Sequence, residues 1–170
     1  MQEHEMHAEW IDVTIDSIKK IIAKKDDIIA VGTTSLRTLE TLYWLGVKAA
    51  LNPGSKNLEL HQWDVYEDPL ANSNISVTRA LQALITWLEK RNMNRLFTQT
   101  QLLIAKGYQF KIVKALVTNF HQPQSTLLLL VAAAVGDDWR KIYNYALEND
   151  FRFLSYGDGN LIFLPNPPPP

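Results

Sequence analysis

Cysteine is absent from the 170 residues of this chain. Its absence excludes disulfide bridges, thiolate nucleophiles and cysteine-ligated metal sites. An excess of positive charge is absent too, because 17 basic side chains stand against 18 acidic ones and the formal net charge is −1. Proteins that bind nucleic acid through overall charge are usually strongly basic, so any contact with RNA must use a local patch or residues outside this chain.

Long hydrophobic runs are also missing. The longest one, Leu127–Val135, is too short to cross a bilayer. The stretch Met1–Glu9 is polar and ionisable, which is unlike a secretory signal peptide. We therefore expect a cytoplasmic protein without membrane contact. A Walker loop, a glycine-rich dinucleotide fingerprint and a G-x-S-x-G motif are absent as well, so the sequence carries none of these nucleotide-binding and hydrolase signatures.

Apolar material is plentiful, because 46% of the residues are hydrophobic and 21% are charged, as in ordinary globular proteins. A length of 170 residues suits one domain or a large part of one. The four closing prolines, Pro167–Pro170, cannot join a packed element. We therefore expect residues 1–164 to form the folded domain and residues 165–170 to be a disordered tail.

Apolar periodicity and capping residues predict alternating strands and helices. The expected strands are Trp10–Val13, Ile28–Val31, Gln62–Tyr66, Gln101–Ile104, Gln109–Val113 and Ala115–Thr118, followed by a hairpin of Phe151–Ser155 and Asn160–Leu164. The expected helices begin at Thr14, Ser35, Ser76, Ser125 and Asp137 or Asp138, and the second of them is expected to stop at Gly46. This alternation favours an α/β fold, with a mixed and partly parallel sheet or a distorted barrel-like core, and flanking helices.

A first polar segment follows the expected strand 28–31. Gly32 permits a tight turn, and the hydroxyls of Thr33, Thr34 and Ser35 lie where a helix begins, with Arg37 close behind. The free N–H groups of a helix N-terminus suit a carboxylate or a phosphate. The alternative is a capped helix without a ligand, and the segment taken alone favours that alternative.

A second polar segment, Thr118–Thr126, has the same strand, turn and helix design. Ser125 is explained as an N-cap of the following helix. Asn119 and His121 need a further explanation, because burying their polarity is unfavourable unless each group is paired. His121 has a suitable pKa range for a general acid or base, and a structural histidine that bonds loop carbonyls is an equally good reading.

Two shorter segments complete the candidates. His4 and His7 would point to opposite faces of a strand, so a metal site there is not expected, although acid–base or substrate-binding use remains open. Near the C-terminus, Tyr156 and Asp158 flank Gly157 in an expected turn that places a phenol and a carboxylate near each other. The turn alone accounts for this pattern.

The order of these segments is more distinctive than any one of them. The chain contains HEMHAEW (His4–Trp10), AVGTTSLRTLE (Ala30–Glu40), LVTNFHQPQSTLLLLVAA (Leu116–Ala133) and FRFLSYGD (Phe151–Asp158). In their order and in their residue sequences, these segments closely resemble the S-adenosylmethionine:tRNA ribosyltransferase-isomerase family, over about residues 3–163. Members of that family are longer and have a further N-terminal region. The resemblance therefore implies that residues 1–164 are the C-terminal part of the catalytic α/β domain of a larger two-domain enzyme.

The resemblance also implies a reaction. Enzymes of this family transfer and isomerise the ribosyl part of S-adenosylmethionine onto 7-aminomethyl-7-deazaguanine at the wobble position of tRNA, which gives epoxyqueuosine in queuosine biosynthesis. S-adenosylmethionine is then a ribosyl-donor substrate, and no metal is expected. The implied partners are that tRNA and the missing N-terminal region of the same enzyme.

The roles of individual residues follow from the same resemblance. His121 is the first choice for proton transfer and His7 the second, and Asp158 joins them in the expected catalytic group. The expected substrate-binding residues are Glu9, Thr33, Thr34, Ser35, Arg37, Asn119, Ser125, Thr126 and Tyr156. Among these, the turn after Gly32 would hold the methionine carboxylate or a tRNA phosphate.

Two alternatives to this function stay open. A fragment that lacks half of the active-site wall would be a non-catalytic module that binds a nucleoside or RNA, and this chain alone is expected to be inactive. A paralogue acting on another nucleoside is the second alternative. It is motivated by Lys114, Gln122 and Gln124, which depart from the residues common in the family.

Overall fold

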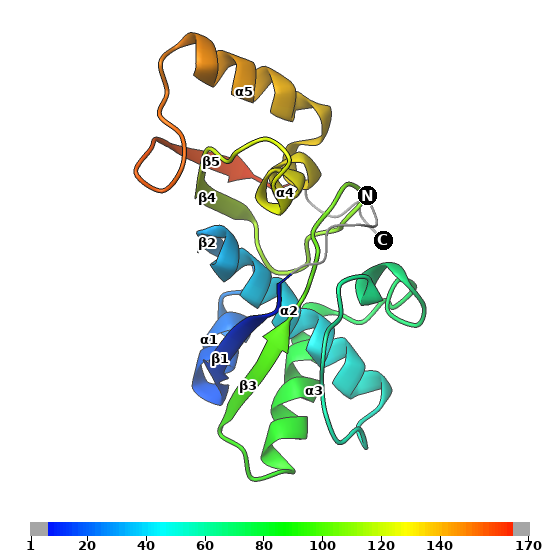
Figure 1. Ribbon diagram of the computed structural model, residues 1–170. Coiled ribbons are helices and arrows are strands. Elements are labelled where there is room, and N and C mark those ends of the chain that lie inside the picture. The colour runs from blue at the N-terminus through cyan, green and yellow to red at the C-terminus, as the bar shows by residue number, and fades with distance from the viewer. Residues whose placement is uncertain (1–6, 165–170) are drawn as a thin grey trace. The chain divides into compact units, whose positions relative to one another are not determined.

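The computed structural model describes residues 7–164 (Figure 1). The chain divides into two compact units. Unit 1 comprises Met1–Asp26 and Thr38–Leu103, and unit 2 comprises Asp27–Arg37 and Ile104–Pro170. Helix α2 (Thr33–Leu51) begins in unit 2 and continues in unit 1. Among the described residues, none of the helices has the length and apolar character needed to cross a membrane.

Unit 1 combines helices with a two-stranded antiparallel sheet. Strand β1 (Glu9–Thr14) pairs with β3 (Arg95–Thr100). The other elements are α1 (Ile15–Ala23), most of α2, the short 3-10 helix η1 (Asp64–Tyr66) and α3 (Val77–Glu89). The core consists of fully buried aliphatic side chains, among them Ile18, Leu42, Leu45, Leu81, Leu84, Leu88 and Leu96.

Helices α1 and α3 begin where serine and threonine can cap them. Thr14 Oγ1 accepts a hydrogen bond from Ser17 N at 3.2 Å, and Ser76 Oγ accepts one from Arg79 N at 3.3 Å. Each bond satisfies one of the N–H groups that a first helical turn leaves without an internal partner. Both starts were predicted from the sequence, and both are confirmed.

Helix α2 does not stop at Gly46, as the sequence had indicated, but continues to Leu51. Glycine is required at position 46 for another reason. A Cβ atom at Gly46 would lie 2.3 Å from the carbonyl oxygen of Ala80 in α3. The two helix backbones of unit 1 therefore approach each other too closely for any side chain, and Gly46 serves helix packing instead of helix termination.

Unit 2 is built on a three-stranded mixed sheet with the order β2–β4–β5. Strand β2 (Ile29–Val31) lies parallel to β4 (Ala115–Asn119), and β5 (Gly159–Phe163) runs antiparallel to β4. Helix α4 (Thr126–Val135), the 3-10 helix η2 (Gly136–Asp138) and α5 (Trp139–Glu148) follow β4 in the chain. The predicted mixed, partly parallel α/β character is confirmed. The described strands form two open sheets and no closed barrel, so the barrel-like alternative is wrong for this part of the chain.

Several predicted strands are wrong. Residues 62–66 contain η1, while residues 101–104 and 109–113 are irregular. Apolar side chains such as Leu102, Leu103 and Ile112 are buried there without a regular ladder, so burial produced the strand-like pattern. The strand β3, which the prediction omitted, has the alternating burial of a sheet with one inner face.

The C-terminal hairpin is also corrected. Residues 151–155 are not a strand, and β5 pairs with β4 instead. At the start of α5, Asp138 occupies the N-cap position but makes no capping bond; its carboxylate accepts a hydrogen bond from Lys141 Nζ at 2.7 Å. Residues 165–170 lie outside the described residues, so the disordered tail and the single-domain boundary at residue 164 remain predictions.

Candidate functional site

The topology of unit 2 brings several polar segments to one edge of its sheet. Because β2 and β4 are parallel, their carboxyl ends lie at the same edge, and the antiparallel strand β5 begins there, with Asn119 opposite Gly159. The segment before β5, the turn after β2 and the loop after β4 therefore share this edge. In open α/β sheets, ligands collect in the crevice outside the carboxyl ends of parallel strands.

The turn after β2 starts helix α2 at this edge. Gly32 has a φ of +90°, a conformation that favours glycine, and its N–H donates to Val117 O at 2.8 Å. Thr33 is half-buried, whereas Thr34 and Ser35 are exposed in the first turn. Arg37 is 4% exposed, so it is buried and not a surface residue. Hydroxyl groups and N–H groups thus stand together beside β4.

His121 lies in the loop that follows β4. Its Nε2 is 2.9 Å from Thr118 Oγ1, and its backbone N–H donates to the hydroxyl of Tyr143 at 3.0 Å. Burial lowers the pKa of the imidazole below its usual value of 6.5, because the charged form is less well solvated. His121 is therefore neutral at pH 7, held by a buried tyrosine and a strand hydroxyl.

Asn119 and Asp158 order the turn before β5. Asn119 Nδ2 donates to the carbonyl oxygens of Gly157 at 3.2 Å and Asp158 at 3.4 Å. The Asp158 carboxylate accepts hydrogen bonds from the backbone N–H of Arg152 at 2.7 Å and from its guanidinium at 3.4 Å. These bonds lower the pKa of Asp158, so this carboxylate is ionised at neutral pH. Next to it, the side chain of Tyr156 is 98% exposed.

Ser125 and Thr126 form the start of helix α4. The Ser125 hydroxyl accepts a hydrogen bond from Leu128 N at 3.2 Å and donates to Gln122 O at 2.8 Å. The predicted N-cap is confirmed, and this hydroxyl is engaged within the loop. Phe120, by contrast, is 3% exposed and lies 5.4 Å from Tyr143 between ring centroids. Phe120 therefore belongs to the core.

Ten of the twelve residues predicted from the sequence belong to unit 2, and the topology assembles their segments around one edge. The other two, His7 and Glu9, belong to unit 1, where His7 is exposed and Glu9 begins β1. His4 lies outside the described residues. Within residues 7–164, no cluster of three or more histidine or acidic side chains has the arrangement of a metal site.

Unit 2 is therefore a mixed α/β unit whose polar, partly buried side chains gather at the edge of the sheet where open α/β sheets commonly bind ligands. Comparison with known proteins specifies the family. A family model described as "queuosine biosynthesis protein" matches residues 1–66 and 71–162. The chain belongs to this queuosine biosynthesis family.

Curated relatives agree with the family match. An S-adenosylmethionine:tRNA ribosyltransferase-isomerase from Burkholderia lata is 37% identical over 164 residues, which cover 94% of this chain and 35% of the relative. A protein of the same name from Dichelobacter nodosus is 34% identical over 170 residues, covering 98% of this chain and 35% of the relative. The chain thus spans about a third of the length of the curated relatives that it matches.

A solved structure is similar as well. The crystal structure of an S-adenosylmethionine tRNA ribosyltransferase from Thermotoga maritima matches with a TM-score of 0.57 and 30% sequence identity. The match covers 91% of this chain and 40% of that chain. The resemblance inferred from the sequence segments is therefore confirmed at the level of family and fold.

Proposed function

We propose that this chain carries part of the active site of an enzyme that transfers and isomerises the ribosyl moiety of S-adenosylmethionine to 7-aminomethyl-7-deazaguanine in tRNA. The family match over nearly the whole chain carries the proposal. The name that the relatives share supplies the donor and the tRNA acceptor. The wobble position, the product epoxyqueuosine and a cytoplasmic location are the finer parts of this proposal.

The reaction sets clear chemical demands. A sulfonium acidifies the adjacent ribose carbon, so a base must take a proton there. Adenine leaves well only when a donor protonates it, and the amine of the modified base must be neutral before it attacks. The catalytic group therefore needs a residue that exchanges protons near neutral pH.

His121 is the residue that we assign to this proton transfer. Its lowered pKa keeps the imidazole neutral at pH 7, as a base requires. If Nε2–H donates to Thr118 Oγ1, the other ring nitrogen, Nδ1, is free of a proton and can accept one from the substrate. In this proposal Thr118 accepts the Nε2 proton and so favours that tautomer. His7 remains the second choice for this proton transfer.

The remaining residues have binding roles in this proposal. The first turn of α2, with Thr33, Thr34 and Ser35, would hold the methionine carboxylate or a tRNA phosphate, reinforced by Arg37. Asn119 and the ionised Asp158 would orient adenosine or the modified base, and Glu9 would bind ribose hydroxyls. Additional contacts are assigned to Ser125 and Thr126, with Tyr156 as a stacking surface. The hydroxyl of Ser125 can contribute only beside its capping bonds.

A second proposal concerns whether this chain forms the whole active site by itself. The named activity belongs to relatives of which this chain covers 35%. We propose that the remaining part of such a protein supplies part of the active-site wall, so that this chain by itself binds at most a nucleoside or RNA and releases no adenine.

The test measures adenine release from S-adenosylmethionine with tRNA that carries 7-aminomethyl-7-deazaguanine. This chain is compared with a version extended at its N-terminus by the corresponding region of a relative, and unmodified tRNA serves as the control. Release by the extended protein alone, and only with modified tRNA, supports both proposals. Release with unmodified tRNA favours a paralogue with another acceptor. If both proteins fold and neither releases adenine, the proposed reaction is wrong.

A further inference from the structure

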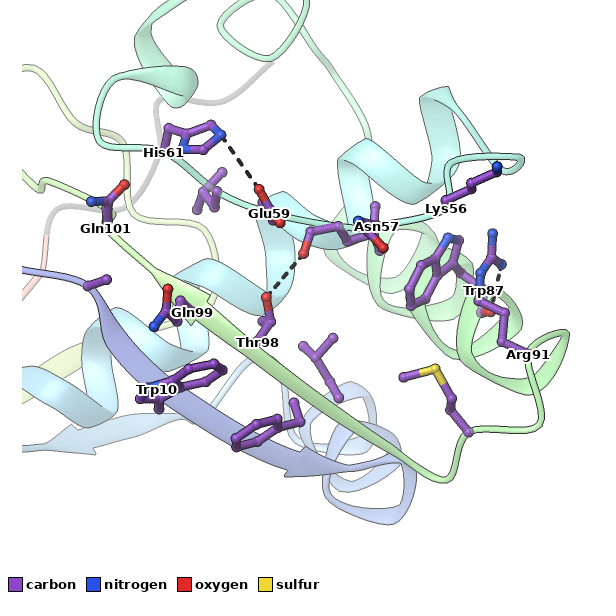
Figure 2. A pocket seen from close by; sticks show the side chains of 16 residues that line it. Trp10, Lys56, Asn57, Glu59, His61, Trp87, Arg91, Thr98, Gln99 and Gln101 are labelled. Carbon is purple, nitrogen blue, oxygen red and sulfur yellow. Dashed lines mark hydrogen bonds and ion pairs between the residues drawn. The ribbon is translucent and has the colours of Figure 1, made fainter.

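Unit 1 contains a groove that no residue of the proposed active site lines. It has a volume of about 460 Å³ and lies between residues 56–61, strand β3 and the end of helix α3, with Trp10 of β1 at one side (Figure 2). All of its lining residues belong to unit 1. The groove can therefore be interpreted from this unit alone.

A pair of exposed aromatic rings forms one end of the groove. Trp10 and Phe97 stack with their centroids 4.7 Å apart and an interplanar angle of 10°. Their side chains are 62% and 59% exposed, although rings of this size are normally buried. Both project from the outward face of the β1–β3 pair, which keeps them in place. Two parallel, exposed rings on the sheet form a platform on which nucleobases can stack.

Positive charge lies at the other end of the groove (Figure 2). The Arg91 guanidinium lies 4.1 Å from the centroid of the Trp87 ring, and its Nη1 donates to Trp87 O at 3.1 Å. Lys56 is exposed, and within residues 7–164 it has no ion-pair partner. Glu59 is the one acidic residue in the lining, and its Oε2 lies 4.0 Å from Nε2 of His61. Two cationic side chains, Lys56 and Arg91, against the single carboxylate of Glu59 favour binding of a negatively charged phosphodiester at this end of the groove.

Amide side chains lie between the two ends. Gln99 is directly opposite Trp10 in the strand register, and Asn57 lies on the facing segment (Figure 2). Primary amides can both donate to and accept from the edges of unstacked bases. The order along the groove is thus stacking surface, hydrogen-bonding groups and positive charge, which matches the base and backbone of a single-stranded nucleotide chain.

We propose that this groove binds a single-stranded segment of RNA, with bases stacked on Trp10 and Phe97 and the backbone phosphate near Lys56 and Arg91. The net charge of −1 gives the chain no general affinity for nucleic acid, so the contact must be local. The inference relies on the proposed function only in taking the RNA to be a tRNA loop. Binding itself is independent of the reaction.

The experiment measures binding of this chain to a fluorescein-labelled ten-nucleotide RNA by fluorescence anisotropy, with a duplex of the same sequence for comparison. Replacing Trp10 or Phe97 with alanine should weaken binding by about 5- to 100-fold, because each stacked base contributes substantially. Both rings are exposed, so the fold should tolerate the change, and circular dichroism checks this. Tyr145→Ala, which removes a ring that is 61% exposed in unit 2, should bind like the wild type.

A salt titration tests the phosphate contact. Lys56→Gln should lower the slope of log affinity against log salt by about 0.7, the value for one phosphate contact with a single strand. Lys20→Gln, which removes an exposed lysine of α1, should leave the slope unchanged.

Three binding results would overturn the proposal. They are failure of the wild-type chain to bind the RNA, equal binding by the alanine variants, and equal preference for the duplex. Self-association that disappears in Trp10→Ala would assign the platform to a protein interface instead, and would also overturn it. If the chain does not bind RNA but the extended protein releases adenine, the groove is refuted and the proposed reaction stands. RNA binding by this chain, together with no adenine release by the extended protein, supports the groove and refutes the proposed reaction.

Discussion

Replacing Gly46 with alanine tests the close approach of helices α2 and α3 in unit 1. The added Cβ would lie 2.3 Å from Ala80 O and 2.5 Å from Ala80 C. Both atoms belong to the backbone of α3, which cannot rotate away as a side chain would. The residues beside the glycine, Leu45 and Val47, are fully buried, so α2 has no free space on this side into which it can shift.

The expected magnitude follows from two opposing effects. Alanine favours the helix over glycine by about 1 kcal/mol. Against this, the Cβ is about 1 Å short of van der Waals contact, and overpacking of a core costs about 1–3 kcal/mol. We take the upper value because the obstacle is backbone. Gly46→Ala should then lower the free energy of unfolding by about 2 kcal/mol, or the melting temperature by about 4–8 °C.

Urea unfolding followed by tryptophan fluorescence measures this change. Four of the five tryptophans, Trp10, Trp44, Trp63 and Trp87, lie in unit 1, so the signal reports on the affected part. Gly54→Ala is the matched control, because the nearest atom to its Cβ would be 3.8 Å away. This control should change stability by less than about 0.5 kcal/mol. A Gly46→Ala protein as stable as the wild type would refute the close helix approach.

Three further predictions concern buried or titrating polar groups. Thr41→Val should cost about 1–3 kcal/mol in urea unfolding, because the hydroxyl of Thr100, 2.7 Å away, loses a buried partner; unchanged stability would contradict this. For Asp64, burial raises the pKa, but the hydrogen bond from Lys48 at 2.6 Å contributes to a net lowering. The stability lost in Asp64→Asn should therefore be fully visible above about pH 5 and shrink as the pH falls through the lowered pKa of the carboxyl. His121 should titrate below pH 6.5 by NMR, and because its pKa is lowered by burial, protonation at acid pH should destabilise the fold; a midpoint above 6.5 would contradict the buried position.

Local signals in the sequence predicted the element starts well. Thr14, Ser76 and Ser125 each precede an apolar run, and each accepts a hydrogen bond from the backbone N–H three residues later. A cap of this kind depends only on residues within one turn, so it can be read without knowledge of the fold. Strands β2 and β4 were found for a similar reason, because buried parallel strands are short continuous apolar runs.

Signals that depend on distant partners led to wrong predictions. Leu102, Leu103 and Ile104 are buried apolar residues, yet residues 101–104 form no strand. Phe151–Ser155 resembles one arm of a hairpin, yet β5 pairs with β4, whose residues lie at least forty positions earlier in the chain. Gly46 was predicted to end α2 for a similar reason, because Ala80, whose backbone it faces, is far away in sequence.

The candidate site was predicted by residue type and only partly by geometry. The polar segments after β2 and β4 were identified because each follows an apolar strand and precedes a helix. The groove of unit 1 was missed because its residues are far apart in sequence: α1, β2 and α2 lie between Trp10 and Lys56, and η1 and α3 lie between Lys56 and Phe97. Burial alternates along β3, but Leu96 and Phe97 are adjacent apolar residues, so the local pattern did not indicate that Phe97 is exposed.

The sequence by itself determined the α/β class, the capped helices and the family, because these depend on short-range chemistry and on the order of segments along the chain. Tertiary structure alone decided that β5 joins β4, that Asn119 holds the turn at Asp158, and that Trp10 stacks on Phe97. The physical reason is that each of these contacts joins residues far apart in the chain. Their pairing is selected by the burial and hydrogen bonding of the whole unit, which no local pattern encodes.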